Sequence, residues 1–207
     1  MRSAKANALW PRGRFDALTI VAHWLTAILV TFVGGLGLAI VCLDKPEFMP
    51  PLLLLHRSTG VAIWAITLAR LLWRRTFSRF PAFPERMSIA QQWLVAATER
   101  SLYGLLLLQP LTGMASTIAL GRPFALFVWT VPALMPRSLE ISLWLAGVHA
   151  ATAGCLLAVV GVHAARALVH RHFLRDDIFE AMAPWTRKRA KRAAIRELRV
   201  VANSREA

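Results

Sequence analysis

Four apolar runs, each long enough to cross a lipid bilayer, constrain this chain more than any other feature. They cover roughly residues 17–43, 51–73, 101–120 and 141–169, and a helix needs about 20 residues to cross the hydrocarbon core. Of the 207 residues, 57% are apolar, in runs too unbroken for a soluble bundle. Because backbone groups in lipid must bond within their own segment, the sequence predicts an all-α membrane protein with a bundle of four transmembrane helices.

The ends of the spans follow from helix-start signals and breakers. We expect the third helix to begin near Ser88, a candidate N-cap before IAQQWLVAATER. The predicted spans are then about 17–43, 51–73, 90–118 and 141–169. There is no internal repeat or long linker, so residues 1–184 are interpreted as one domain, followed by a basic tail at 185–207. The tail is expected to lie on the inner leaflet as a helix, with RNA or protein binding as the alternative.

The basic residues are distributed very unevenly between the connections. Residues 1–16, 74–100 and 170–207 together carry 19 Lys and Arg, whereas the connections 44–50 and 121–140 carry 3. Lys and Arg are in excess on the cytoplasmic side. We therefore expect both termini in the cytoplasm and a multi-pass protein of the bacterial inner membrane. The net charge of +14 could also indicate a nucleic-acid partner. Because the basic residues are concentrated on one side of the membrane, we expect them to contact membrane lipid instead.

The connection 121–140 differs from the others because it holds three prolines among aromatic and aliphatic residues. It is too broken to span a membrane. We expect it at the outer interface as a short helix, with Trp129 at headgroup level. A lid over an outer cofactor or substrate opening is the alternative.

Four histidines lie inside the apolar runs, where ionisable side chains are costly and generally functional. His23 comes early in the first run, His56 opens the second, and His149 and His163 lie at opposite ends of the last. Because successive spans alternate in direction, His23 and His163 are expected at the inner depth. His56 and His149 are expected at the outer depth.

The spacing in the last run predicts two stacked sites. Fourteen residues separate His149 from His163, which leaves them about 40° apart on one face and about 21 Å apart along the axis. Haem iron takes axial imidazoles, and facing helices can supply one each. The pairs His23/His163 and His56/His149 are thus predicted as the axial ligands of two haems. Interhelical hydrogen bonding is the alternative for a single histidine; zinc or copper is disfavoured, because no carboxylate or thiol lies at matching depth.

Small and basic residues beside these histidines suit a flat, anionic group. Gly60 follows His56 by one turn and is expected to admit a ring, as are Gly34, Gly35 and Gly37, for which close helix packing is the alternative. Arg57 is a candidate for the outer propionates and Arg166 for the inner ones, with snorkelling to the interface as the alternative.

A fifth histidine extends the last span. His170 lies two turns after His163, so we expect it to share that face and to point to water. It is the candidate for protonating a bound quinone, with a plain interfacial histidine as the alternative.

These residues resemble the bacterial cytochrome b-561 family. The matching pieces are RFDALTIVAHWL, LHRSTGVAIWAITLARLLWR, LYGLLLLQPLTG and HAATAGCLLAVVGVHAARALVHRHFLRDD, in order over about residues 14–184. The resemblance implies two b-type haems on His23, His56, His149 and His163, and electron exchange with ubiquinone. No C-x-x-C-H attachment motif is present, which agrees with non-covalent haem.

The resemblance favours a superoxide:ubiquinone oxidoreductase, because one branch of the family oxidises superoxide at the outer face. Superoxide is an anion, and Arg57, Arg122 or Arg137 would attract it, although Asp44, Glu47 and Glu140 lie on the same side. The first alternative is a membrane-anchor subunit that passes electrons between a redox donor protein and the quinone pool. The second is a haem-free transporter or scaffold.

Overall fold

Four long helices form the body of the molecule. The computed structural model describes residues 15–78, 88–174 and 178–183. The helices are α2 (Ala17–Cys42), α3 (Met49–Thr76), α4 (Ile89–Ala119) and α5 (Leu139–Val169), and each is long and apolar enough to cross a membrane. The predicted four-helix membrane fold is confirmed. The basic tail predicted at 185–207 lies outside the described residues.

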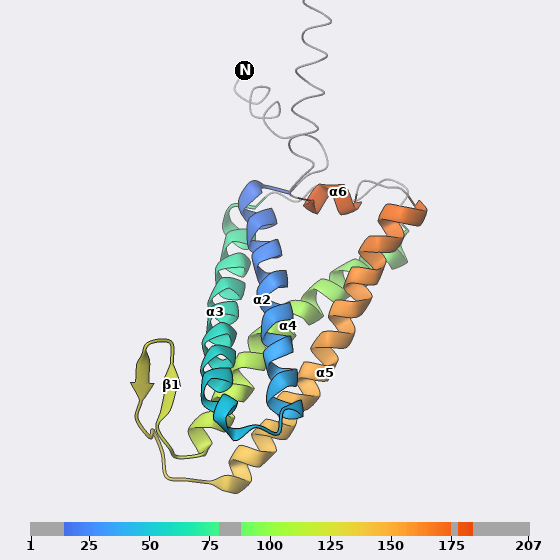
Figure 1. Ribbon diagram of the computed structural model, residues 1–207. Coiled ribbons are helices and arrows are strands. Elements are labelled where there is room, and N and C mark those ends of the chain that lie inside the picture. Colours follow the sequence, from blue (N-terminus) through green and yellow to red (C-terminus); the bar gives the residue numbers. More distant parts are fainter. Residues whose placement is uncertain (1–14, 79–87, 175–177, 184–207) are drawn as a thin grey trace, which may run out of the picture.

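Consecutive helices run in opposite directions, so the bundle has two distinct ends (Figure 1). One end holds the short helix α6 (Ile178–Met182), the start of α2 and the end of α3. At the other end are the 3₁₀ turn η1 (Pro46–Phe48) and a β-hairpin. We call these the α6 end and the hairpin end.

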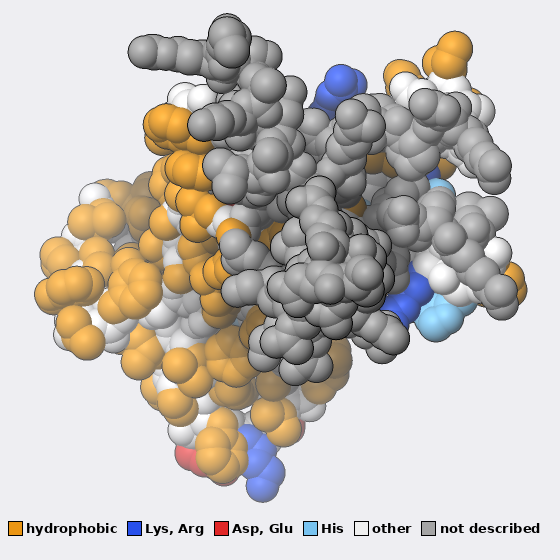
Figure 2. All heavy atoms as spheres, turned by 90° about the horizontal axis from the view of Figure 1, so that it is seen from above, with side chains coloured by type: hydrophobic (Ala, Val, Ile, Leu, Met, Phe, Trp, Pro, Cys, Tyr) orange, Lys and Arg blue, Asp and Glu red, His pale blue; other side chains and the backbone are white. Residues whose placement is uncertain are grey.

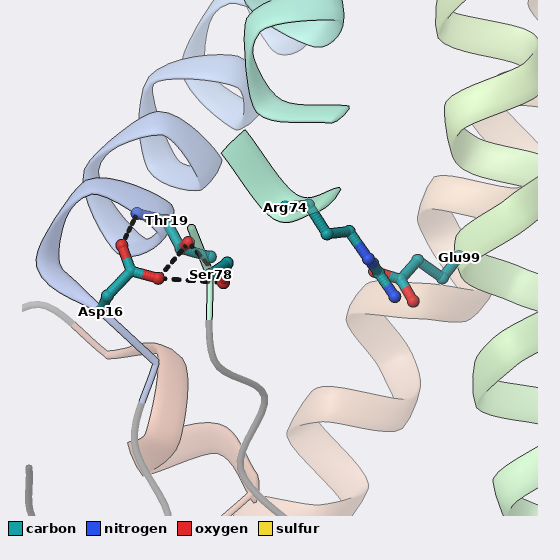
Figure 3. A network of polar contacts seen from close by, with 5 residues as sticks. All are labelled: Asp16, Thr19, Arg74, Ser78 and Glu99. Atoms are coloured by element: carbon teal, nitrogen blue, oxygen red, sulfur yellow. Dashed lines mark hydrogen bonds and ion pairs between the residues drawn. The ribbon is translucent and has the colours of Figure 1, made fainter. Parts of the chain in front are cut away.

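Side-chain caps begin two of the helices at the α6 end. Asp16 caps α2, accepting from Thr19 N at 2.9 Å, and also accepts from Ser78 Oγ at 3.0 Å (Figure 3). It accepts a further bond from Trp73 Nε1 at 3.1 Å. These bonds join the start of α2 to the end of α3. Burial alone would raise the pKa of Asp16, but the hydrogen bonds outweigh it and lower that pKa below its usual value. Ser88 caps α4 in a reciprocal capping box with Gln91, as its sequence position predicted.

The buried core is small and takes one residue from each helix: Val30, Ile63, Leu106 and Leu156. Most other large apolar side chains face outward; Val41 is 83% exposed. Figure 2 shows such hydrophobic side chains over the flanks of the bundle, seen from the α6 end. An exterior of this kind is expected in lipid, because apolar side chains gain no free energy there by moving from the hydrocarbon into the bundle.

The connection between α4 and α5 forms a β-hairpin and not the short helix expected from sequence. Strands β1 (Phe124–Leu126) and β2 (Trp129–Val131) pair antiparallel, with Leu126 opposite Trp129. The prolines of this segment oppose a helix, and its aromatic and β-branched residues favour extended backbone. The chain enters through Gly121 at φ +61, where a Cβ would lie 2.5 Å from the backbone nitrogen of Arg137.

Candidate functional site

The structure brings the four histidines together in the two pairs that their depths predicted. At the α6 end, the ring centroids of His23 on α2 and His163 on α5 lie 6.1 Å apart, with 62° between their planes. Towards the hairpin end, those of His56 on α3 and His149 on α5 lie 6.0 Å apart, with 76° between their planes. The helix α5 therefore supplies one member of each pair.

This separation fits an iron atom held between two imidazoles. A metal–imidazole bond of about 2 Å on each side, added to the radius of each ring, puts the two centroids about 6 Å apart. A ring stack or a direct hydrogen bond between the imidazoles would bring them closer. Both pairs thus have the spacing of axial ligands, and the residues present fit haem.

Hydrogen bonds fix the orientation of the His149 ring. Its Nδ1 lies 2.9 Å from the backbone oxygen of Gln109 on α4. A carbonyl only accepts, so Nδ1 carries the proton and Nε2 keeps its lone pair. Partners of this kind set the tautomer and raise the basicity of metal-binding histidines. The amide Nε2 of Gln109 lies 3.3 Å from the lone-pair nitrogen of His149, a contact that an iron atom would replace.

The side chain of Gln109 strengthens the same contact between α4 and α5. Its Nε2 donates to the backbone oxygen of His149 at 3.0 Å, and its Oε1 accepts from Thr152 Oγ1 at 2.6 Å. Thr112 Oγ1 lies 3.2 Å from His149 Nδ1 and donates to the Gln109 oxygen at 2.9 Å. Pro110, the residue after Gln109, lies inside α4.

Two glycines leave room for the rings at the hairpin end. A Cβ on Gly113 of α4 would lie 2.8 Å from His149 Cε1, closer than real Cβ contacts come. A Cβ on Gly37 of α2 would lie 3.2 Å from His56 Cε1. A Cβ on Gly60, by contrast, would lie 3.9 Å from Pro110 Cβ, an ordinary contact, and one on Gly35 would meet nothing within 4 Å. The close approaches that the site requires are therefore at Gly37 and Gly113.

The surroundings of the His23/His163 pair are aromatic and basic. Trp24 lies edge-on to His23, with centroids 5.9 Å apart, and its Nε1 donates to the backbone oxygen of Met182 at 2.9 Å. Arg166 has a buried Nη1 with no hydrogen-bond partner among the described residues. A buried guanidinium nitrogen in this state suits an anionic group such as a propionate.

Arg57 lies against the hairpin, and His170 is buried. Arg57 lies over the ring of Phe124 in the hairpin, 5.6 Å from its centroid, and the neighbouring Ser58 accepts from Phe127 N at 2.8 Å. His170 is only 9% exposed, so the prediction that it points to water is wrong. The chain leaves α5 in the π-helical segment η2 (His170–Leu174), whose wider winding departs from the α-helical face and packs against α6.

Sequence reasoning did not identify the partners of His149, namely Gln109, Thr112, Gly113 and Thr152. A signal was present in QPLTG, where polar residues and a proline interrupt an apolar span. The sequence does not give the rotation of α4 about its axis, and this rotation decides that Gln109, Thr112 and Gly113 face α5.

Comparisons with known proteins give matches over most of the chain. A family model described as prokaryotic cytochrome b561 matches residues 14–185. The chain is 24% identical over 177 residues to a "Probable superoxide oxidase CybB" of Yersinia pestis, covering 83% of this chain and 96% of that protein. It is 27% identical over 178 residues to "Cytochrome b561 homolog 2" of Escherichia coli (strain K12), covering 82% and 90%.

Proposed function

The chain belongs to the prokaryotic cytochrome b561 family, and from this premise we propose that it is a di-haem superoxide:ubiquinone oxidoreductase. The family is one of membrane electron-transfer proteins with b-type haem. The observation that carries the proposal is the presence of two imidazole pairs, with centroids 6.1 and 6.0 Å apart, at opposite depths of one bundle. A bundle with a single haem needs only one such pair.

In this proposal, His23 and His163 hold one haem and His56 and His149 hold the other. Bound haem supplies one-electron transfer. The chain orients and encloses the haem. The backbone oxygen of Gln109 holds the His149 proton on Nδ1, Gly37 and Gly113 leave space for the imidazole rings, and the apolar helices exclude water. We assign the inner propionates to Arg166, and the outer propionates or an incoming anion to Arg57.

We further propose that the α6 end faces the cytoplasm. The described parts of three segments, residues 15–16, 74–78, 88–100 and 170–174, lie at or towards this end. In sequence these segments carry the 19 basic residues counted above. Residues 1–184 then form one domain of the inner membrane with both termini inside. The hairpin end, with Arg122 and Arg137 in its connection, faces outward and attracts superoxide. The name of the Yersinia pestis relative supports this donor.

Ubiquinone is placed near the haem at the α6 end, because its reduction consumes protons and these come from the cytoplasm. His170 follows α5 at that end, so we assign it a part in delivering the proton. Since it is buried, it would pass a proton from a neighbouring group or water, and not take one directly from bulk solvent.

Spectroscopy of the purified protein tests the haem assignment. A pyridine haemochrome assay should give two b-type haems per chain, and His23→Ala and His163→Ala should remove the same spectral component. His56→Ala and His149→Ala should remove the other one. A colourless protein would instead support a haem-free transporter or scaffold.

Stopped-flow kinetics test the donor and the acceptor separately. Superoxide should reduce the haems of the isolated chain, and added ubiquinone should reoxidise them. His170→Ala should slow reoxidation and leave reduction intact, whereas Arg57→Ala should do the reverse, provided that its haem still binds. If superoxide fails to reduce the haems and a redox protein co-purifies, the chain is a membrane-anchor subunit.

A further inference from the structure

Two serines join α4 to α5 near the hairpin end through a pair of reciprocal hydrogen bonds. The hydroxyl of Ser116 donates to the backbone oxygen of Ser142 at 2.9 Å, and the hydroxyl of Ser142 donates to the backbone oxygen of Ser116 at 2.9 Å. Ser142 is only 4% exposed, so solvent is largely excluded from this contact. We call Ser116 and Ser142 the serine clamp. The haem sites proposed above do not use it.

The serine clamp follows the same register as the contact between Gln109 and His149. Ser142 lies seven residues before His149 on α5, and Ser116 lies seven residues after Gln109 on α4. Seven residues are nearly two helical turns, so each serine lies within about 20° of the face of the residue that it accompanies, about 10 Å along the axis. The two contacts are therefore two points on one antiparallel interface.

The contacts of His149 depend on where α4 lies along α5. The Nδ1 of His149 lies 2.9 Å from the backbone oxygen of Gln109, and its Cε1 lies where a glycine such as Gly113 is needed to leave room. A shift of α4 by one residue would move these groups by about 1.5 Å and by about 100° around the axis. A larger side chain would then face the ring. The orientation of this imidazole therefore requires a fixed register between the two helices.

Apolar contacts alone define such a register poorly in a membrane. Lipid tails contact leucine and valine side chains about as favourably as a neighbouring helix does, whereas a hydrogen bond between helices requires one alignment of donor and acceptor. The two bonds of the serine clamp run in opposite directions, each from a side chain of one helix to the backbone of the other. Sliding of α4 along α5 therefore breaks both bonds together.

We propose that the serine clamp fixes the register of α4 along α5, and that Ser116 and Ser142 are thereby positioning residues for His149. They act through the two helix backbones, because their hydroxyls bond to main-chain oxygens about two turns from the ligand. The consequence for a bound haem rests on the proposed function, in which His149 is an axial ligand.

Disulfide trapping in the purified full-length protein tests the register without haem. In a chain with Cys42→Ser and Cys155→Ser, the pair Ser116→Cys and Ser142→Cys should form an interhelical disulfide under a mild oxidant, since the two Oγ atoms lie 3.4 Å apart. Ala115→Cys with Ser142→Cys is the control, because Ala115 lies about 100° away around α4. Protection of the thiols from alkylation, measured by mass spectrometry, reports the bond. Equal trapping of both pairs would overturn the fixed register.

Haem retention tests the positioning. In the haem-loaded protein, Ser116→Ala and Ser142→Ala should each speed the transfer of the hairpin-end haem to apomyoglobin about threefold, the factor expected for one interhelical hydrogen bond in a membrane. The electron paramagnetic resonance g-values of that haem should shift, while the α6-end haem keeps its rate and its signal. Thr117→Val is the matched control and should change neither haem, because the Thr117 hydroxyl donates within α4, to the backbone oxygen of Gly113.

The disulfide separates positioning from a direct effect of the hydroxyl groups. The Ser116→Cys/Ser142→Cys protein should release the hairpin-end haem fast when reduced and at the wild-type rate when oxidised, because the disulfide restores the register. Alanine variants with wild-type transfer rates and g-values would overturn the proposal, and so would equal changes at both haems. A wild-type protein that binds no haem would overturn the positioning of a haem ligand together with the proposed function, while disulfide trapping would still decide the register.

Discussion

The two histidine pairs have the same spacing but different surroundings. Near the hairpin end, α4 presses Gln109, Thr112 and Gly113 against His149, and the ring is held by hydrogen bonds. At the α6 end, Trp24 lies edge-on to His23, and Arg166 has a buried Nη1 with no hydrogen-bond partner among the described residues. Helix packing alone thus sets the distance between ligands, while a third helix sets the orientation of one ring.

The close contacts of Gly113 and Gly37 predict that added volume disturbs the pair near the hairpin end. Gly113→Ala should have the largest effect, because its Cβ would lie 2.8 Å from His149 Cε1. The ring must turn, so the haem proposed at the hairpin end should be lost while the one proposed at the α6 end stays. Haem content and the reduced-minus-oxidised spectrum measure this.

Gly104→Ala is the control in the same helix, since nothing lies within 4 Å of its Cβ position. It should keep both haems and raise the free energy of unfolding by up to about 1 kcal/mol, because alanine favours the helix more than glycine does. Full, unaltered haem content in Gly113→Ala would contradict the fit described here.

Gly37→Ala should perturb the same haem from the other side, but less. Its Cβ would lie 3.2 Å from His56 Cε1, a contact that a small ring displacement relieves. We expect a haem that stays bound with shifted electron paramagnetic resonance g-values. Gly35→Ala, two positions away with open space, should leave the spectrum unchanged; equal shifts in both variants would indicate a general effect on α2.

Gln109→Leu tests the orienting contacts without adding volume. It removes the side-chain bonds to His149 O and to Thr152 and keeps the backbone oxygen that accepts from Nδ1, so the ring retains its tautomer but is held less firmly against the iron. A hydrogen bond of about 1 kcal/mol corresponds to a rise of about 40 mV in the midpoint potential of the haem proposed at the hairpin end. Potentiometric titration measures both haems, and the α6-end haem serves as the internal control. A rise at both haems would show that Gln109 acts through the whole bundle.

Asp16→Ala should give the smallest effect and should act at the α6 end. Loss of an N-cap costs about 1 kcal/mol. Because the pKa of Asp16 is lowered in the folded protein, its contribution is present above the ordinary carboxyl pKa of 3.8 and is lost as the pH falls through the lowered value. Thermal unfolding of wild type and variant should therefore converge in acid. Ser88→Ala, which removes the cap of α4, should also lower the stability of the protein. The difference from wild type should not disappear in acid, because serine carries no titrating carboxyl group.

Depth along a helix could be read from sequence, but rotation about its axis could not. The pairs His23/His163 and His56/His149 follow from counting residues along alternating spans, which needs no knowledge of packing. The contact of Gln109 with His149 depends on how α4 rolls against α5, which side-chain packing over many turns decides. The hairpin and the burial of His170 were missed for a related reason, since both depend on local departures from α-helical winding.

The position of both His149 and His163 on α5 limits how the length of this chain can vary. Their partners lie on separate helices, α3 and α2. One residue inserted between them would rotate one ligand by about 100° and move it by about 1.5 Å relative to the other, and at most one pair would survive. Insertions in the connection 121–138, before α5 begins, leave this relation unchanged. Thirteen residues, 150–162, therefore form the one stretch of the last span where a deletion or insertion would separate the two sites from each other.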